Sequence, residues 1–200
     1  LLLTTTRNTH TGFHLTLELF RLKLFTKIER GKLMTSSTSS GKKKGREGEE
    51  KVKSFLKKYA KIHRLKLTNG IYLPMYNDCC EIDHILFGDF GVVVIETKNI
   101  SGKIFGNDKD KFLVHQIGTK THKLYNPVLQ NETHCKNVTH HLNKAGIKNV
   151  PVYSIVVFSD RDIFIENSKI GVKLIGLQHR LEKLQPAGFD AKKLYKIILK

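Results

Sequence analysis

The chain has 200 residues, 40% of them hydrophobic, so it is long enough to bury a substantial core as one domain with appendages. It carries 35 Lys and Arg residues against 18 Asp and Glu residues, a formal net charge of +17. This surplus favours a polyanionic partner, nucleic acid before an anionic membrane surface, over a basic surface that only aids solubility. No apolar run is long enough to span a membrane. The three cysteines fit neither a disulfide framework nor a CxxC zinc motif, which indicates a reducing, cytoplasmic location.

Residues 1–44 are predicted to form a poorly structured basic segment followed by a Ser/Lys-rich linker. Residues 15–25 alternate like an edge strand or an amphipathic surface segment, without the continuous apolar stretch of a signal peptide. The polar run after Met34 is typical of a flexible linker. Met34 is a candidate natural start, and we expect residues 1–33 to carry little function.

A first helix is predicted from Gly45 to about Lys61, because apolar residues recur there at helical spacing. Extended backwards, the apolar stripe passes through Glu49. A carboxylate on a core-facing stripe is costly without a partner, which makes Glu49 a candidate site residue. Alternatively, Glu49 lies in the first turn and only favours the positive end of the helix dipole. The sequence leaves both interpretations open.

The most informative stretch is a strand–turn–strand pattern over residues 81–98. Two runs rich in Ile, Val and Phe flank Gly88-Asp89-Phe90-Gly91, which predicts an antiparallel hairpin after an extended segment at residues 66–76. A register centred on this turn pairs Phe87 with Val92, Ile85 with Val94, and Asp83 with Glu96. A shift of one residue would move every side chain to the other face, so the site below depends on this register.

The hairpin ends in a cluster of charged residues. Directly opposed carboxylates repel, so Asp83 opposite Glu96 predicts a cation between them. Side chains alternate along a strand, which puts Glu96 and Lys98 on one face and Thr97 on the other. Two carboxylates and a lysine at a sheet end are typical of a metal-dependent hydrolytic centre. The competing interpretation is a surface ion-pair ladder in which Glu81 lies opposite Lys98.

The rest of the chain alternates strand and helix signals. In order, they predict short strands near residues 103–105 and 112–114, a helix from Asn126-Pro127 to Ala145-Gly146, a buried strand at residues 152–158, an edge strand at 170–175, and a terminal helix capped by Asp190. The helix after Asn126 places Gln130, His134, Asn137 and His141 on its polar side. His134 with His140 or His141 could bind a metal, but HExxH is absent, and solvated or phosphate-facing histidines are the favoured interpretation.

Four motifs in this order resemble the nuclease-related domain (NERD) family over residues 45–175. They are Gly45-Arg-Glu-Gly-Glu49, Glu81-Ile-Asp83-His84, Gly91-Val-Val-Val-Ile-Glu96-Thr-Lys98-Asn99, and Asn126-Pro-Val-Leu-Gln130. The resemblance implies an α/β fold with a restriction-endonuclease-like core, a central mixed β-sheet flanked by helices. Residues 176–200 would form a C-terminal helical extension.

The same resemblance implies an active site of the D…ExK type. Asp83 and Glu96 would bind Mg²⁺, or Mn²⁺, with the Thr97 carbonyl as a further ligand, although Thr97 stands where Val or Ala is common. Lys98 would position or activate the attacking water. The remaining two site positions would be Glu49, which matches an acidic residue on the first helix, and Gln130, which matches the family's NPxxQ stretch.

The expected function is metal-dependent phosphodiester hydrolysis of nucleic acid, most simply DNA, in DNA processing or defence, with a helicase as a possible partner. A hard cation held by carboxylates can stabilise the pentavalent phosphorus, activate water and screen the leaving oxygen. The alternative is a catalytically weak or inactive nucleic-acid-binding module with the same fold, acting beside a partner enzyme. A third hypothesis is a membrane-surface protein that uses the basic N-terminal segment.

Overall fold

The computed structural model describes residues 39–75 and 78–200. The chain divides into two units, residues 1–40 and 41–200, and the fold described here is that of the second unit. The predictions for residues 15–25 and for Met34 lie outside the described residues. No helix in the described part of the chain is long and apolar enough to cross a membrane.

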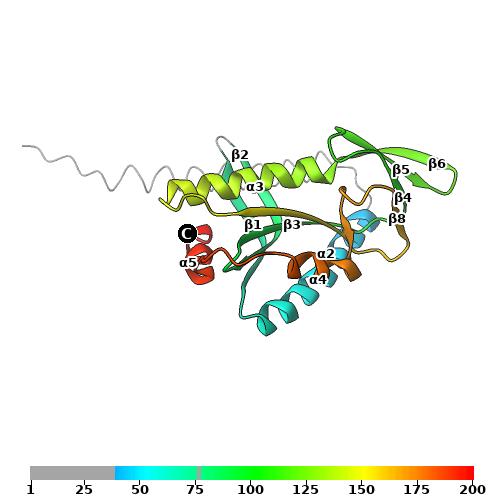
Figure 1. The fold of residues 1–200 in the computed structure, drawn as a ribbon. Helices are drawn as coiled ribbons and strands as arrows, with labels where there is room; N and C mark the ends of the chain where they lie inside the picture. Colours follow the sequence, from blue (N-terminus) through cyan, green and yellow to red (C-terminus); the bar gives the residue numbers. More distant parts are fainter. Residues whose placement is uncertain (1–38, 76–77) are drawn as a thin grey trace, which may run out of the picture. The chain divides into compact units, whose positions relative to one another are not determined.

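The centre of the second unit is a five-stranded mixed sheet in the order β1-β2-β3-β7-β9 (Figure 1). The first three strands are antiparallel, whereas β7 pairs in parallel with β3, and β9 in parallel with β7. The bounds are β1 (Lys66–Met75), β2 (Asp78–Gly88), β3 (Gly91–Lys98), β7 (Val152–Phe158) and β9 (Val172–Lys173). This arrangement confirms the predicted α/β architecture with a central mixed sheet.

Helices cover both faces of this sheet (Figure 1). They are α2 (Ser39–Ile62) and α4 (Leu177–Glu182) on one face, and α3 (Pro127–Lys144) and α5 (Ala191–Ile198) on the other. Successive side chains of a strand point to opposite faces, so Val93 and Ile95 pack toward α2 while Val92 and Val94 pack toward α3 and α5. Burial on both faces explains why β3 reads as a continuous apolar run.

A second sheet of four strands, in the order β6-β5-β4-β8, lies beside the first. Its strands are β4 (Gly102–Phe105), β5 (Phe112–Ile117), β6 (Lys120–Tyr125) and β8 (Ile163–Ile165). One face buries Ile104, Leu113 and Ile163 against Val156 and Phe158 of β7. One face of this sheet therefore packs against the protein core, and the opposite face is open to solvent.

The hairpin register agrees with the prediction, since Phe87 pairs with Val92 and Ile85 with Val94. The caps of two helices also agree. The Asn126 side chain accepts a hydrogen bond from the N–H of Val128 at the start of α3, and Asp190 caps α5 in the same way. Local sequence signals were sufficient for these features.

Two boundaries differ from the prediction. Helix α2 begins at Ser39, so residues 39–44, expected to be part of a linker, are helical. This first part of the helix is held by tertiary contacts, because the Asn99 side chain donates to the Lys44 carbonyl at 2.6 Å and Lys44 pairs with Asp160 at 3.1 Å. The expected edge strand at 170–175 is reduced to β9, and a 3₁₀ turn, η1 (Leu174–Gly176), follows it.

Candidate active site

The candidate carboxylates lie where the pairing of β2 with β3 ends. Backbone partners run from Gly88–Gly91 to His84–Ile95. One position further along, Asp83 Oδ2 accepts a hydrogen bond of 2.7 Å from the backbone N–H of Thr97. The Asp83 side chain is thus hydrogen-bonded to β3 at the residue that follows Glu96. This contact fixes the Asp83 carboxylate relative to β3.

Glu96 is buried, with 3% of its surface exposed, and lies between two nitrogen-bearing side chains. Lys98 Nζ donates to Glu96 Oε1 at 2.6 Å and to Gln130 Oε1 at 3.1 Å. On the other side, His134 Nε2 lies 3.4 Å from Glu96 Oε2, without the geometry of a hydrogen bond. Buried carboxylate oxygens normally have a hydrogen-bond partner, so the unpartnered Oε2 is an unusual feature of this site.

Glu49 approaches the same region from α2 because the helix packs unusually close at Gly48. A Cβ on Gly48 would lie 2.4 Å from Asn99 Cβ and 2.6 Å from Ser159 Oγ, so only glycine permits this contact. Ser159 in turn donates to Asn99 Oδ1 at 3.0 Å. Glu49 follows Gly48 directly and is therefore held near the ends of β3 and β7. Because α2 begins at Ser39, Glu49 does not lie in its first turn, and the interpretation of Glu49 as a helix-dipole residue is wrong.

Burial and mutual repulsion perturb the three carboxyl groups. Burial, and then the charge of Glu96, raise the pKa of Asp83 to about 7, although the Thr97 hydrogen bond opposes this. Burial also acts to raise the pKa of Glu96, but His134 and Lys98 outweigh it and hold that pKa below its ordinary value. The pKa of Glu49 is raised by burial and then by Glu81 and Glu96. Burial is thus the largest cause of both raised pKa values, and repulsion among the carboxylates adds to it.

The residues present fit a hard divalent cation. The described residues contain no group of three or more His, Cys, Asp or Glu side chains arranged to hold a metal ion. An ion here would be held by Asp83 and Glu96 together with carbonyl and water oxygens, and Mg²⁺ accepts such a sparse protein shell. The raised pKa of Asp83, to which the charge of Glu96 contributes, agrees with a position that an added positive charge would stabilise. The ligand role of the Thr97 carbonyl stays a prediction.

The expectation of solvated histidines on α3 is wrong for His134, which is buried, whereas His140 is exposed and His141 is half-buried. His134 and Asn137 are 6% and 2% exposed. Asn137 Nδ2 donates to the Leu73 carbonyl at 3.2 Å and to Cys80 Sγ at 3.0 Å. Burial lowers the pKa of His134, but interactions with Cys80 and Glu96 outweigh burial and raise it to about 9. A polar stripe shows which side of a helix needs polar partners, but it does not show whether water or strands supply them.

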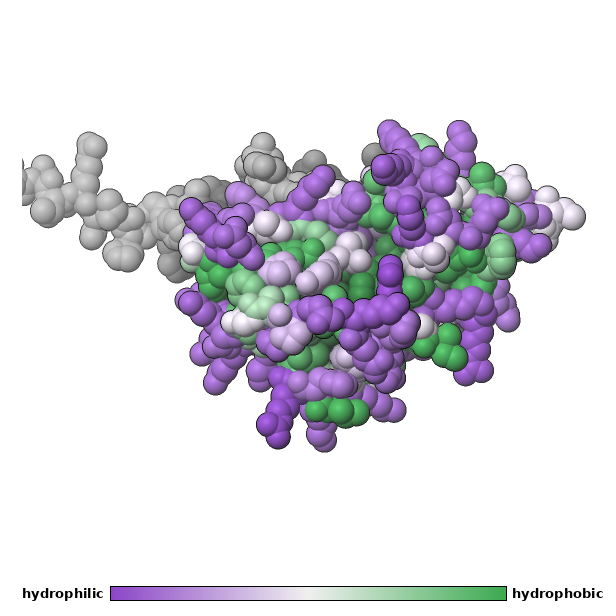
Figure 2. Space-filling model, in the orientation of Figure 1, coloured by the Kyte–Doolittle hydropathy of each residue, from purple (hydrophilic) through white to green (hydrophobic). Residues whose placement is uncertain are grey.

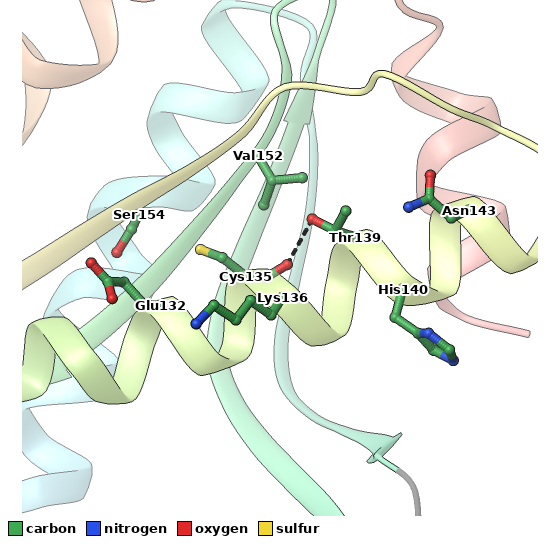
Figure 3. A pocket seen from close by; sticks show the side chains of 8 residues that line it. All are labelled: Glu132, Cys135, Lys136, Thr139, His140, Asn143, Val152 and Ser154. Atoms are coloured by element: carbon green, nitrogen blue, oxygen red, sulfur yellow. Dashed lines mark hydrogen bonds between the residues drawn. The ribbon is translucent and has the colours of Figure 1, made fainter.

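A separate pocket of about 500 Å³ lies on another side of α3 (Figure 3). In Figure 3, the Cys135 thiol points toward Ser154, while Glu132 and Lys136 flank the opening. Burial raises the pKa of Cys135 to about 12, so its thiol stays protonated and is not an activated nucleophile. None of the predicted site residues lines this pocket.

The mixed sheet, the carboxylates at the ends of adjacent strands and the neighbouring lysine define a nuclease-related domain of the restriction-endonuclease-like class. The model of the NERD family, the nuclease-related domain, matches residues 44–159. Because this match covers more than half of the chain, the chain belongs to that family. It is also 37% identical over 95 residues to an uncharacterized protein of Bacillus anthracis, covering 48% of this chain and 45% of that protein. The match thus spans about half the length of the curated relative.

Proposed function

We propose that this domain hydrolyses phosphodiester bonds of nucleic acid with the help of a divalent cation, Mg²⁺ or Mn²⁺. The observation that carries the proposal is the geometry at the ends of β2 and β3. Asp83 is fixed to the backbone beside Glu96, and Lys98 Nζ lies 2.6 Å from a Glu96 oxygen. Membership of the nuclease-related family supports the same reaction class.

The cation, when bound, would polarise the scissile phosphate and lower the pKa of an attacking water. Asp83 and Glu96 would hold it, and Glu49 would add negative charge to the same region. Lys98 would place its ammonium near the phosphate and the attacking water, where a fixed positive charge stabilises the transition state. The water oxygen attacks phosphorus, the bond to the leaving oxygen breaks, and that oxygen takes up a proton.

Gln130 would act through Lys98, and His134 would act through Glu96. Gln130 Oε1 accepts from Lys98 Nζ at 3.1 Å, so it limits the positions that the ammonium can adopt. His134 lies against the Glu96 oxygen that Lys98 does not contact, and a protonated His134 keeps Glu96 ionised. Both are therefore positioning residues in this proposal.

The test compares cleavage and binding in two variants. Purified protein is incubated with circular and linear DNA in Mg²⁺, Mn²⁺ or a chelator, and metal binding is followed by calorimetry. Glu96→Gln should lose both cleavage and metal binding, whereas Lys98→Ala should lose cleavage but keep the metal. The exposed Glu47→Gln provides a matched control that should retain both activities.

Binding is measured separately, because a basic surface can hold DNA without turnover. Affinity should fall with salt at a log–log slope of roughly −0.9 per neutralised phosphate on duplex DNA. If the parent protein cleaves nothing with either metal while both variants bind DNA as the parent does, the domain is a binding module acting beside another enzyme. A helicase partner, a role in DNA processing or defence, and a cytoplasmic location stay predictions.

A further inference from the structure

The solvent-facing side of the sheet β6-β5-β4-β8 carries a cluster of aromatic rings. Phe112 and Tyr125 are backbone partners on β5 and β6, and their ring centroids are 6.0 Å apart. Phe105 and Phe164 lie on the neighbouring strands β4 and β8, with ring centroids 6.4 Å apart. Phe112, Tyr125 and Phe164 are 48%, 46% and 52% exposed. We call Phe105, Phe112, Tyr125 and Phe164 the ring face.

The strands that carry the ring face contain lysines and no carboxylate, and Glu166 lies directly after β8. Lys103 pairs with Phe164, and Lys123 lies opposite Val114 on the same side of the sheet. Lys111 Nζ lies 5.7 Å from the centroid of the Phe112 ring. The four strands contain no Asp or Glu. Figure 2 shows hydrophilic and hydrophobic residues interspersed over the part of the surface that β5 and β6 form.

Packing within the fold does not account for these rings. The opposite face of the sheet already supplies its core through Ile104, Leu113 and Ile163. Cross-strand aromatic pairs do stabilise a sheet modestly, but that effect needs neither the acid-free strands nor the neighbouring lysines. Exposed rings combined with lysines are instead suited to a polyanion that also presents flat apolar groups. Nucleic acid with unpaired bases has this chemistry, because its bases stack on aromatic rings while lysines contact its phosphates.

The sheet of the ring face is joined to the candidate active site by two chain connections. Strand β4 follows the Lys98 end of β3, and β6 ends at Tyr125, directly before the α3 cap Asn126. The fully buried Asn126 donates from Nδ2 to the carbonyl of Asp110 at 2.7 Å and to two other carbonyls of the same loop. The loop between β4 and β5 is thereby fixed to the start of α3, the helix that carries Gln130.

We propose that the ring face binds unpaired bases of single-stranded nucleic acid and holds that strand beside the candidate active site. The inference rests on the nucleic-acid partner of the proposed function and narrows it to substrates with a single-stranded region. In duplex DNA the bases stack on one another and are closed to the rings. The rings therefore discriminate unpaired from paired nucleic acid, whereas the lysines attract both.

The test measures binding in a chelator, where cleavage does not interfere. Fluorescence anisotropy follows labelled oligothymidylate and oligouridylate of about 12 nucleotides, beside a blunt duplex of the same length. Stacking on one ring contributes about 1–3 kcal/mol, so Phe112→Ala and Tyr125→Ala should each weaken single-strand binding roughly 5- to 150-fold. Neither variant should weaken duplex binding to the same extent.

Conservative variants separate stacking from general effects. Tyr125→Phe keeps the ring and should bind as the parent does, whereas Tyr125→Leu keeps apolar bulk and should lose affinity. Ile175→Ala removes an apolar side chain that is 92% exposed in η1, outside this sheet, and should change nothing. Unfolding midpoints of all variants confirm that the fold is retained.

Three results would overturn the proposal: unchanged single-strand affinity in folded ring variants, an equal loss on duplex, or a ring variant that changes only the oligomeric state in light scattering. The last result would make the ring face a contact between copies of the chain. The result of this binding test does not depend on whether the protein cleaves nucleic acid. A protein that binds single strands through the rings but never cuts them would refute the proposed hydrolysis and keep this inference.

Discussion

Replacing Asp83 by asparagine should stabilise the metal-free protein, and the gain should grow with pH. Burial and Glu96 raise the pKa of Asp83 to about 7 from a usual value of 3.8. When the pKa of an acid is higher in the folded state, the folded state loses stability as pH rises between the two values. The loss here is small near pH 4 and reaches about 4 kcal/mol above pH 7, at 1.36 kcal/mol for each pKa unit.

The asparagine side chain would remain neutral and keep an oxygen acceptor for the Thr97 N–H, so Asp83→Asn removes this cost without removing the hydrogen bond. In a chelator at about pH 8, the unfolding midpoint of the variant should exceed that of the parent by roughly 10 °C, from 2–4 °C per kcal/mol at this size. At about pH 4.5 most of the difference should disappear. The exposed Glu47→Gln serves as the control and should show no such pH dependence.

Added Mg²⁺ should reduce the stability advantage of Asp83→Asn at about pH 8. A ligand at 100 times its Kd stabilises the folded state by about 2.7 kcal/mol, and the parent should gain this while Asp83→Asn gains little. The measurement is a set of melting curves with and without metal at both pH values. If Asp83→Asn stabilises the protein equally at both pH values, or destabilises it at about pH 8, the pKa of Asp83 is not raised in the folded state.

Three further changes test individual contacts. Gly48→Ala should cost about 1–3 kcal/mol by overpacking and reduce cleavage, whereas Gly45→Ala, where a Cβ meets nothing within 4 Å, should be neutral or slightly stabilising in thermal melts. The pKa of His134 is about 9 in the folded state, against 6.5 in the unfolded state. The stability that His134 contributes is therefore complete below pH 6.5 and is lost as pH rises through 9. His134→Gln should flatten this alkaline loss of stability in melting curves. Asn131 donates from Nδ2 to two strand carbonyls and a serine hydroxyl, so Asn131→Ala should cost about 1–3 kcal/mol in urea denaturation, while Asn143→Ala on the exposed side of α3 should cost little.

The structural features that the sequence predicts correctly are those with local signals. The register of β2 and β3 follows from alternating apolar residues around a tight turn, and both strands are adjacent in the chain. The cap Asn126 and the bounds of β7 likewise depend on neighbouring residues. The placement of Asp83 beside the strand that carries Glu96 then follows from geometry alone.

The features that the sequence does not predict depend on residues that come into contact only in the folded protein. Gly48 is an unremarkable helix residue until Asn99 and Ser159 pack against it. The burial of His134 depends on how α3 is rotated over β3 and β7, which helical periodicity does not specify. Strands β6 and β8 also escaped prediction, because β6 has little apolar alternation and β8 pairs with the distant β4.

The parallel pairing of β3 with β7 has a consequence for the order of folding. The two strands are separated in the chain by β4, β5, β6 and α3, so their contact requires the closure of a long loop. The β2–β3 hairpin needs no such closure and can form on a faster timescale. We therefore expect Asp83 and Glu96 to meet in a nascent hairpin before α3 delivers Gln130 and His134, with only Lys98 and water to screen their charges until the last long-range contacts form.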